Sequence, residues 1–192
     1  MEAYTILNHE KFLRTRSKEV DFTKDSYQKE IEVLEEFCLE HEVLAMAAVQ
    51  IGIQKRIIYL KNTDIDNLED QEHNERRILI NPVITKRIGL TEYWEACASC
   101  LNNMGRVLRP YKIEIEYVDE FGEKQKSIFE GFEATVLSHE YDHLNGILHI
   151  DVAEEVLQME KEERKEFRKK HGYEIFSKTG NYQTLLEEKK KG

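Results

Sequence analysis

The sequence predicts an α+β fold in a single domain. Short strand-like segments come first and a long helical segment follows them, whereas a doubly wound α/β sheet would alternate the two throughout. The chain has 192 residues, of which 40% are hydrophobic, and this suffices for one core. We find no internal repeat, so residues 1–192 are expected to form one domain.

The first predicted helix begins after Asp25 or Ser26, either of which can cap it. Its apolar residues recur at the spacing of one helical face: Tyr27, Ile31, Leu34 and Cys38. The helix is expected to run towards Glu42. Two short buried strands are predicted next, at 56–60 (RIIYL) and 78–84 (ILINPVI), with the polar stretch 62–77 between them as a surface loop.

A hairpin and a second helix follow. Residues 112–117 (KIEIEY) alternate as a half-buried strand does, and 121–122 supply the turn. The stretch 131–146 has helical spacing and a glycine at each end. The remainder, 152–192, is expected to be a charged amphipathic helix whose tail is loosely held from Ser177 onward.

Composition limits what the chain can bind. It carries 28 Lys and Arg against 38 Asp and Glu, a net charge of −10, which argues against electrostatic binding of nucleic acid or of an anionic membrane. We see no apolar signal segment and no stretch long enough to span a bilayer. An odd number of cysteines (3) favours a reducing compartment, so we expect a cytoplasmic protein.

The strongest local signal is the motif His139-Glu140-Tyr141-Asp142-His143. Residues four apart lie one turn above each other on a helix, so both imidazoles can bind one metal ion, with the Glu140 carboxylate beside it. About one chain in a few hundred of this length has H-E-x-x-H by chance. Here the motif lies where a helix is independently expected.

A catalytic site of this kind needs a third protein ligand. Neither His149 nor His171 has the spacing of a third histidine ligand, and both are interpreted as surface or structural residues. A thiolate from Glu95-Ala96-Cys97-Ala98-Ser99-Cys100 is a better candidate. Spacing alone does not choose between Cys97 and Cys100.

Three segments together resemble the peptide deformylase family, whose members remove the formyl group from the starting methionine of new chains. In chain order the family has G-x-G-L-A-A-P-Q, E-G-C-L-S and H-E-x-x-H. The counterparts here are VLAMAAVQ at 43–50, EACAS at 95–99 and HEYDH at 139–143. The resemblance covers about 5–151, and it implies antiparallel sheets around the helix that carries H-E-x-x-H.

The resemblance also implies the site residues. The metal ligands would be Cys97, His139 and His143, and the metal would be Fe²⁺, with Zn²⁺ or Ni²⁺ as substitutes. Metal-bound hydroxide would attack the formyl carbon, with Glu140 as the general acid/base.

Further roles follow from the same resemblance. The Gln50 side-chain amide and the Ala98 backbone N–H would stabilise the oxyanion. Glu95 would pair with Arg109 and brace the cysteine loop.

A pocket for the methionine side chain is expected on the metal-facing side of the helix. Phe132, Thr135 and Val136 lie three to seven residues before His139, and Leu44 would complete the lining. Plain core packing is the alternative for these residues.

Several motif positions depart from the family pattern: Val43, Ala45, Val49, Ala96, Ala98, Met104 and Ser138. Ala45 replaces a glycine and adds a methyl group at the substrate groove. At Met104 the family often has an arginine that contacts the peptide. These differences predict altered substrate preference or a reduced rate.

The leading hypothesis is a bacterial cytoplasmic deformylase acting on N-formylmethionyl peptides of nascent chains, with ribosome docking through the C-terminal end as a further possibility. The first alternative is a non-catalytic metal protein that binds N-terminal peptides. The second is an H-E-x-x-H endopeptidase.

Overall fold

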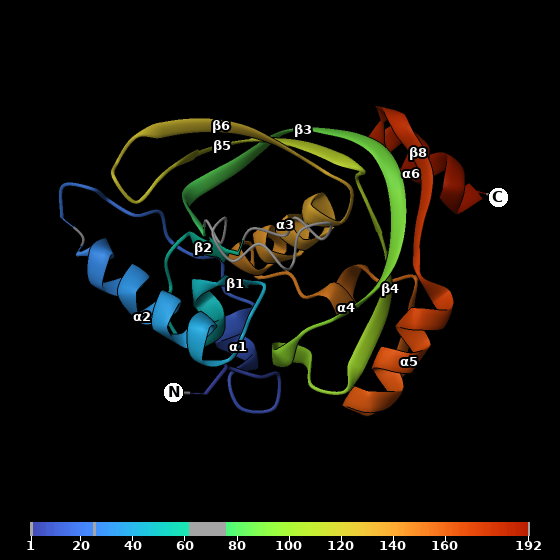
Figure 1. Ribbon diagram of the computed structural model, residues 1–192, viewed down its shortest axis with the longest axis horizontal. Helices are drawn as coiled ribbons and strands as arrows, with labels where there is room; N and C mark the ends of the chain where they lie inside the picture. Colours follow the sequence, from blue (N-terminus) through green and yellow to red (C-terminus); the bar gives the residue numbers. More distant parts are fainter. Residues whose placement is uncertain (1, 25, 62–75, 192) are drawn as a thin grey trace, which may run out of the picture.

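The computed structural model describes residues 2–24, 26–61 and 76–191. Helix α3 (Gly131–Leu144) lies at its centre, and an antiparallel sheet curves around that helix (Figure 1). The sheet order is β1-β2-β3-β4-β7, with β5 and β8 also paired to β3 and with β6 paired to β5. The predicted α+β class is confirmed.

Strand β3 (Arg77–Ala96) organises the sheet. It pairs in turn with β2 (Ile57–Leu60), β5 (Lys112–Val118), β8 (Tyr173–Asn181) and β4 (Asn103–Arg109). The prediction of a short strand ending at Ile84 was therefore wrong. Gly89 allows the strand to continue, because it takes φ +72°, and a Cβ there would lie 2.4 Å from the Ser177 carbonyl oxygen of β8.

Three helical segments precede β3 in the part of the chain that the structure describes. They are α1 (Glu10–Leu13), α2 (Tyr27–Glu40) and the 3₁₀ turn η1 (Ala48–Ile51), with β1 (Ala45–Ala47) preceding η1. All four residues of the predicted apolar face of α2 are buried. Ser26 precedes α2 without a side-chain capping bond, and the helix ends at Glu40, short of Glu42, which has a positive φ. The Asp25 cap and residues 62–75 of the predicted loop lie outside the described residues.

The hairpin is as predicted, with β6 (Lys124–Glu130) returning along β5. It carries the chain directly into α3. The apolar side of α3 packs against this hairpin through Ala134, Leu137 and Leu144. The opposite side of the helix is therefore free to present polar side chains.

The C-terminal prediction needs correction. After α4 (His149–Val152) and β7 (Glu155–Gln158), the charged helix α5 spans Lys161–His171. Residues from Ser177 onward are not loosely held: they complete β8 and form α6 (Tyr182–Lys191), and the Tyr182 hydroxyl donates to the Leu108 carbonyl at 3.0 Å. Among the described residues, no helix is long and apolar enough to cross a membrane.

Candidate metal centre

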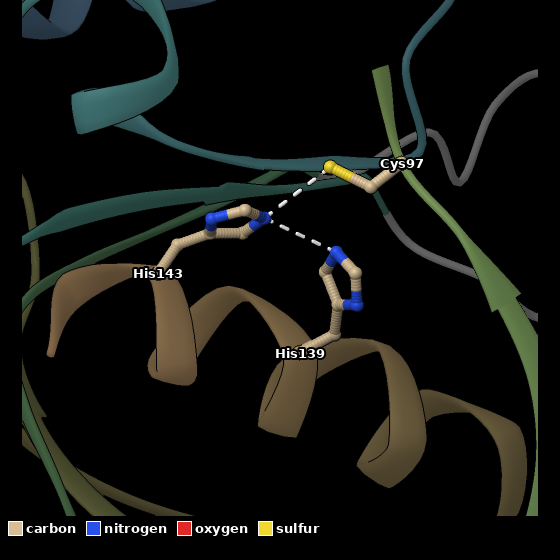
Figure 2. Close-up of side chains that lie close together, drawn as sticks. All are labelled: Cys97, His139 and His143. Atoms are coloured by element: carbon tan, nitrogen blue, oxygen red, sulfur yellow. Dashed lines mark hydrogen bonds between the residues drawn. The ribbon is translucent and has the colours of Figure 1, made fainter. Parts of the chain in front are cut away.

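Cys97, His139 and His143 converge above the polar side of α3 (Figure 2). Their ligand atoms all lie within 4.8 Å of one another. The Nε2 atoms of the two histidines are 3.2 Å apart, and Cys97 Sγ is 3.4 Å from His143 Nε2. Helix α3 supplies both histidines from successive turns, and Cys97 follows the end of β3.

These distances fit a single metal ion. Two nitrogens bound at about 2.0–2.1 Å to one tetrahedral ion lie roughly 3.3 Å apart, and a thiolate bound at about 2.3 Å lies roughly 3.6 Å from each. Glu95 Oε2 is 2.8 Å from His139 Nδ1, so the Nδ1 N–H donates to this carboxylate and Nε2 is the nitrogen that faces the other two ligand atoms. A cation between the three atoms satisfies all of them.

The electrostatics of the group favour positive charge at this point. Burial opposes charge on His139, but the interactions with Cys97 and Glu95 outweigh it and raise the pKa of His139 well above its usual value. A hydrogen bond from Cys100 and the proximity of His143 outweigh burial and lower the pKa of Cys97. Cys97 is thus disposed to be a thiolate, the form that binds metals.

A buried ion pair holds His139 in place. Arg109 donates to both oxygens of Glu95, at 2.7 and 3.0 Å, and also to Asp142. Glu95 and Arg109 are only 3% and 6% exposed. Burial alone would raise the pKa of Glu95, but Arg109 and His139 outweigh it and hold the pKa far below its usual range. The pairing of Glu95 with Arg109 is the one that the family resemblance implied, whereas the contact with Asp142, inside the H-E-x-x-H motif, was not expected.

Glu140 is buried next to the convergent ligands. Its Oε2 accepts a 2.8 Å hydrogen bond from the Ala47 backbone N–H, which fixes the carboxylate against β1. Burial is the main cause that raises the pKa of Glu140, against the lowering effect of His139 and His143. A carboxyl group of this kind can both accept and return a proton.

Gln50 lies on the other side of Cys97. Its Oε1 accepts from the Ala47 N–H at 3.0 Å, which orients the amide, and its Nε2 donates to Cys97 Sγ at 3.3 Å and to the Ser99 hydroxyl at 3.2 Å. The amide N–H groups therefore point towards the ligand cluster. Ala98 begins the 3₁₀ turn η4 (Ala98–Cys100) and is exposed beside the same cluster.

A cavity of about 320 Å³ opens next to this cluster. All of the residues predicted for the substrate pocket line it: Leu44, Ala45, Phe132, Thr135 and Val136. Tyr93 and Arg168 also line the cavity, and neither was predicted from the sequence. Tyr93 lies two residues before Glu95 on one strand, so the period of a strand would have placed both on one face. No local pattern singles out Arg168.

Three other residues named from the sequence lie outside this cavity. Cys100 is fully buried with Leu13 and Leu148. Met104 is fully buried in β4 and does not line the groove. His149 is structural, as one of the two interpretations had it: it is 1% exposed and stacks on His139 with ring centres 5.5 Å apart, and burial lowers its pKa to about 4.

Comparison with known proteins decides the family. The sequence profile described as polypeptide deformylase matches residues 4–159. The chain belongs to the polypeptide deformylase family. A peptide deformylase of Pelagibacter ubique is 35% identical over 142 residues, which cover 73% of this chain and 80% of that protein.

Solved structures of the family agree in fold. The peptide deformylase of Synechococcus elongatus in complex with actinonin has a TM-score of 0.71 and 28% identity, and the match covers 90% of this chain and 88% of that one. The Met-Ala-Ser-bound deformylase of Acinetobacter baumannii has a TM-score of 0.68 and 25% identity, covering 79% and 97%. As a member of this family, the chain is a metal-dependent hydrolase that removes the formyl group from N-formyl peptides of nascent chains.

Proposed function

We propose that this chain releases formate from N-formylmethionyl peptides with one metal ion held by Cys97, His139 and His143. The observation that carries the proposal is the convergence of one sulfur and two imidazole nitrogens beside a buried carboxylate, at the wall of a cavity. The donor set of one thiolate and two imidazoles suits Fe²⁺, which we propose as the cellular metal, with Zn²⁺ or Ni²⁺ as substitutes. When bound, the metal supplies Lewis acidity that lowers the pKa of water.

Glu140 moves the proton. Its carboxylate takes a proton from the attacking water and gives it to the amine nitrogen as the bond from that nitrogen to the formyl carbon breaks. The products are formate and a free amino terminus. The hydrogen bond from Ala47 keeps one carboxylate oxygen fixed while the other carries the proton.

Gln50 and Ala98 stabilise the negative charge that develops on the formyl oxygen. The Gln50 N–H that points at Cys97 Sγ is the one available for this oxygen, because the amide is already oriented through Ala47 and Ser99. The Ala98 backbone N–H supplies a second donor beside Cys97. Donors fixed before the reaction contribute more than donors that must reorient.

The methionine side chain occupies the apolar part of the cavity formed by Leu44, Ala45, Phe132 and Val136. The relative from Acinetobacter baumannii was solved with Met-Ala-Ser, a peptide with an amino-terminal methionine. The Ala45 methyl group narrows the groove next to this pocket, which favours peptides with a small second residue.

We further propose a cytoplasmic location and ribosome docking through the C-terminal segment. Helices α5 and α6 both end in clusters of basic side chains, which support contact with an anionic partner. We also propose that the chain forms one domain, because β8 closes on β3.

The role of Glu140 is tested with Glu140→Gln. This variant should keep about one metal per chain and lose about 10²- to 10⁴-fold in the rate of formate release, because the amide cannot transfer the proton. Glu133→Gln, at the partly exposed start of the same helix, is the matched control and should keep its rate. Near-normal turnover by Glu140→Gln with normal metal content would show that another group is the base.

A further inference from the structure

Helix α5 brings a positive charge into the substrate cavity. The family match ends at residue 159, and α5 begins at Lys161, so this helix lies outside the matched region. Arg168, near the C-terminal end of α5, lines the same cavity as Phe132, Glu140 and His139. It is the only Lys or Arg among the described residues that line the cavity.

The position of Arg168 is fixed by the contacts of its helix. Phe167 packs edge-on against Trp94 of β3 with ring centres 5.0 Å apart, and His171 stacks on Phe167 at 3.9 Å. The Arg164 guanidinium donates to the Leu101 carbonyl at the end of η4. The helix is therefore anchored both to the strand and to the loop that carries the metal-ligating cysteine.

The Arg168 guanidinium has no hydrogen bond or ion pair with any of the described residues, although its side chain is partly buried. The two carboxylates that line the cavity already have partners: Glu95 pairs with Arg109, and Glu140 accepts from Ala47. The charged neighbours of Arg168 on α5 pair with one another, as in the ion pair of Lys169 with Glu166. An uncompensated cation at a substrate groove favours an anionic ligand.

We propose that Arg168 binds a carboxylate within the first residues after formylmethionine, which makes acidic peptides the preferred substrates. This proposal rests on the proposed function. With the methionine side chain in the apolar pocket, the following residues extend at about 3.3 Å each towards the mouth of the cavity. A guanidinium matches a carboxylate with two parallel hydrogen bonds.

The test compares acidic peptides with their neutral isosteres. C-terminally amidated formyl-Met-Asp-Ser and formyl-Met-Asn-Ser probe position two, amidated formyl-Met-Ala-Asp and formyl-Met-Ala-Asn probe position three, and formyl-Met-Ala-Ser with and without its amide probes the terminal carboxylate. The ratio of kcat/KM within each pair cancels any general loss of activity. In the wild type, at least one pair should show a preference of about three- to tenfold for the carboxylate, which weakens at high salt.

The variants assign that preference to one side chain. Arg168→Ala should bring the ratio to about one, and Arg168→Glu should invert it. Lys169→Ala, next in sequence and exposed, should keep it. The pair that responds identifies whether the carboxylate belongs to a side chain or to the peptide terminus.

The two proposals fail in different ways. Formate release without a preference in any pair, or a preference that survives Arg168→Ala, overturns the role of Arg168 and leaves the deformylase activity intact. No release from any peptide refutes the proposed function instead. Calorimetric binding of the same peptides to Glu140→Gln then still tests Arg168, and equal affinities within every pair would overturn its role.

Discussion

At the scale of single residues, the proposed metal site depends on groups other than its three proposed ligands. Glu95 fixes the proton of His139 on Nδ1, and Arg109 fixes Glu95 with two hydrogen bonds while also holding Asp142. A buried ion pair of this kind is not a simple source of stability, since desolvation offsets much of its attraction. The effect of this ion pair is to orient the His139 ring.

Arg109→Ala should therefore affect both stability and the metal. Removal of the guanidinium leaves the buried Glu95 carboxylate without its main partner, which should lower the free energy of unfolding by about 3–5 kcal/mol. Metal affinity should fall about 10- to 100-fold, because His139 loses its orientation. Urea unfolding and competition with a chelator measure the two effects.

Arg106→Ala is the matched control, because Arg106 lies on the same strand but forms partly exposed ion pairs with Glu92 and Glu155. Arg106→Ala should lower the free energy of unfolding by less than about 1 kcal/mol and leave metal affinity unchanged. Equal losses in the two variants would contradict the role given to Arg109.

A second residue, Cys38, sets a pH dependence. Burial raises the pKa of its thiol to about 12. Between the ordinary thiol pKa and this value the folded chain keeps a proton that the unfolded chain has lost, so stability falls as pH rises. Between about pH 8 and pH 10.5, the free energy of unfolding should fall by about 2 kcal/mol more in the wild type than in Cys38→Val. The free energies are measured by urea unfolding. If the wild type and Cys38→Val lose the same free energy of unfolding over this pH range, Cys38 is not the cause of the loss.

At the scale of elements, the helices and strands predicted correctly are those whose apolar residues recur with a clear helical or strand period. The apolar face of α2, the alternation of β5 and the glycine-bounded α3 all appear in the structure as expected. Strand β3 was predicted too short because its second half, TKRIGLTEYWEA, has no clean alternation. That half is a strand because β4, β5 and β8 pair with it, and such long-range pairing leaves no local signal.

The same reason explains the missed C-terminus. Strand β8 and helix α6 contain few buried side chains, so neither has the apolar pattern from which elements are predicted. Strand β8 is held by backbone pairing with β3. Helix α6 is held by the hydrogen bond from the Tyr182 hydroxyl to the Leu108 carbonyl. Likewise, Arg168 reaches the cavity only because Phe167 docks α5 on Trp94, a contact that no motif records.

Deletion of residues 173–192 should destabilise the chain strongly. It removes β8 and α6, leaves one edge of β3 unpaired at Thr91–Tyr93 and uncovers Leu90, which is 3% exposed. We expect a loss of about 3 kcal/mol or more in urea unfolding. Deletion of 187–192 alone removes mainly surface charges and should cost far less. If deletion of 173–192 lowers the free energy of unfolding no more than deletion of 187–192 does, the tail is dispensable for stability.

At the scale of the whole molecule, the fold brings together what the sequence separates. The sheet encloses α3 (Figure 1). The hairpin packs against the apolar side of this helix, and the end of β3 delivers Cys97 above its polar side. The choice between Cys97 and Cys100 was open from spacing alone. In the structure Cys97 lies in the ligand cluster, and Cys100 is fully buried in a cluster with Leu13 and Leu148.

The most direct test of the account is formate release from formyl-Met-Ala-Ser by protein purified anaerobically and loaded with Fe²⁺. The wild type and Cys100→Ser should release formate, and Cys97→Ala should release none, because it lacks one of the three proposed metal ligands. Undiminished release by Cys97→Ala would contradict the metal site. So would the absence of release from wild-type protein that holds about one metal per chain.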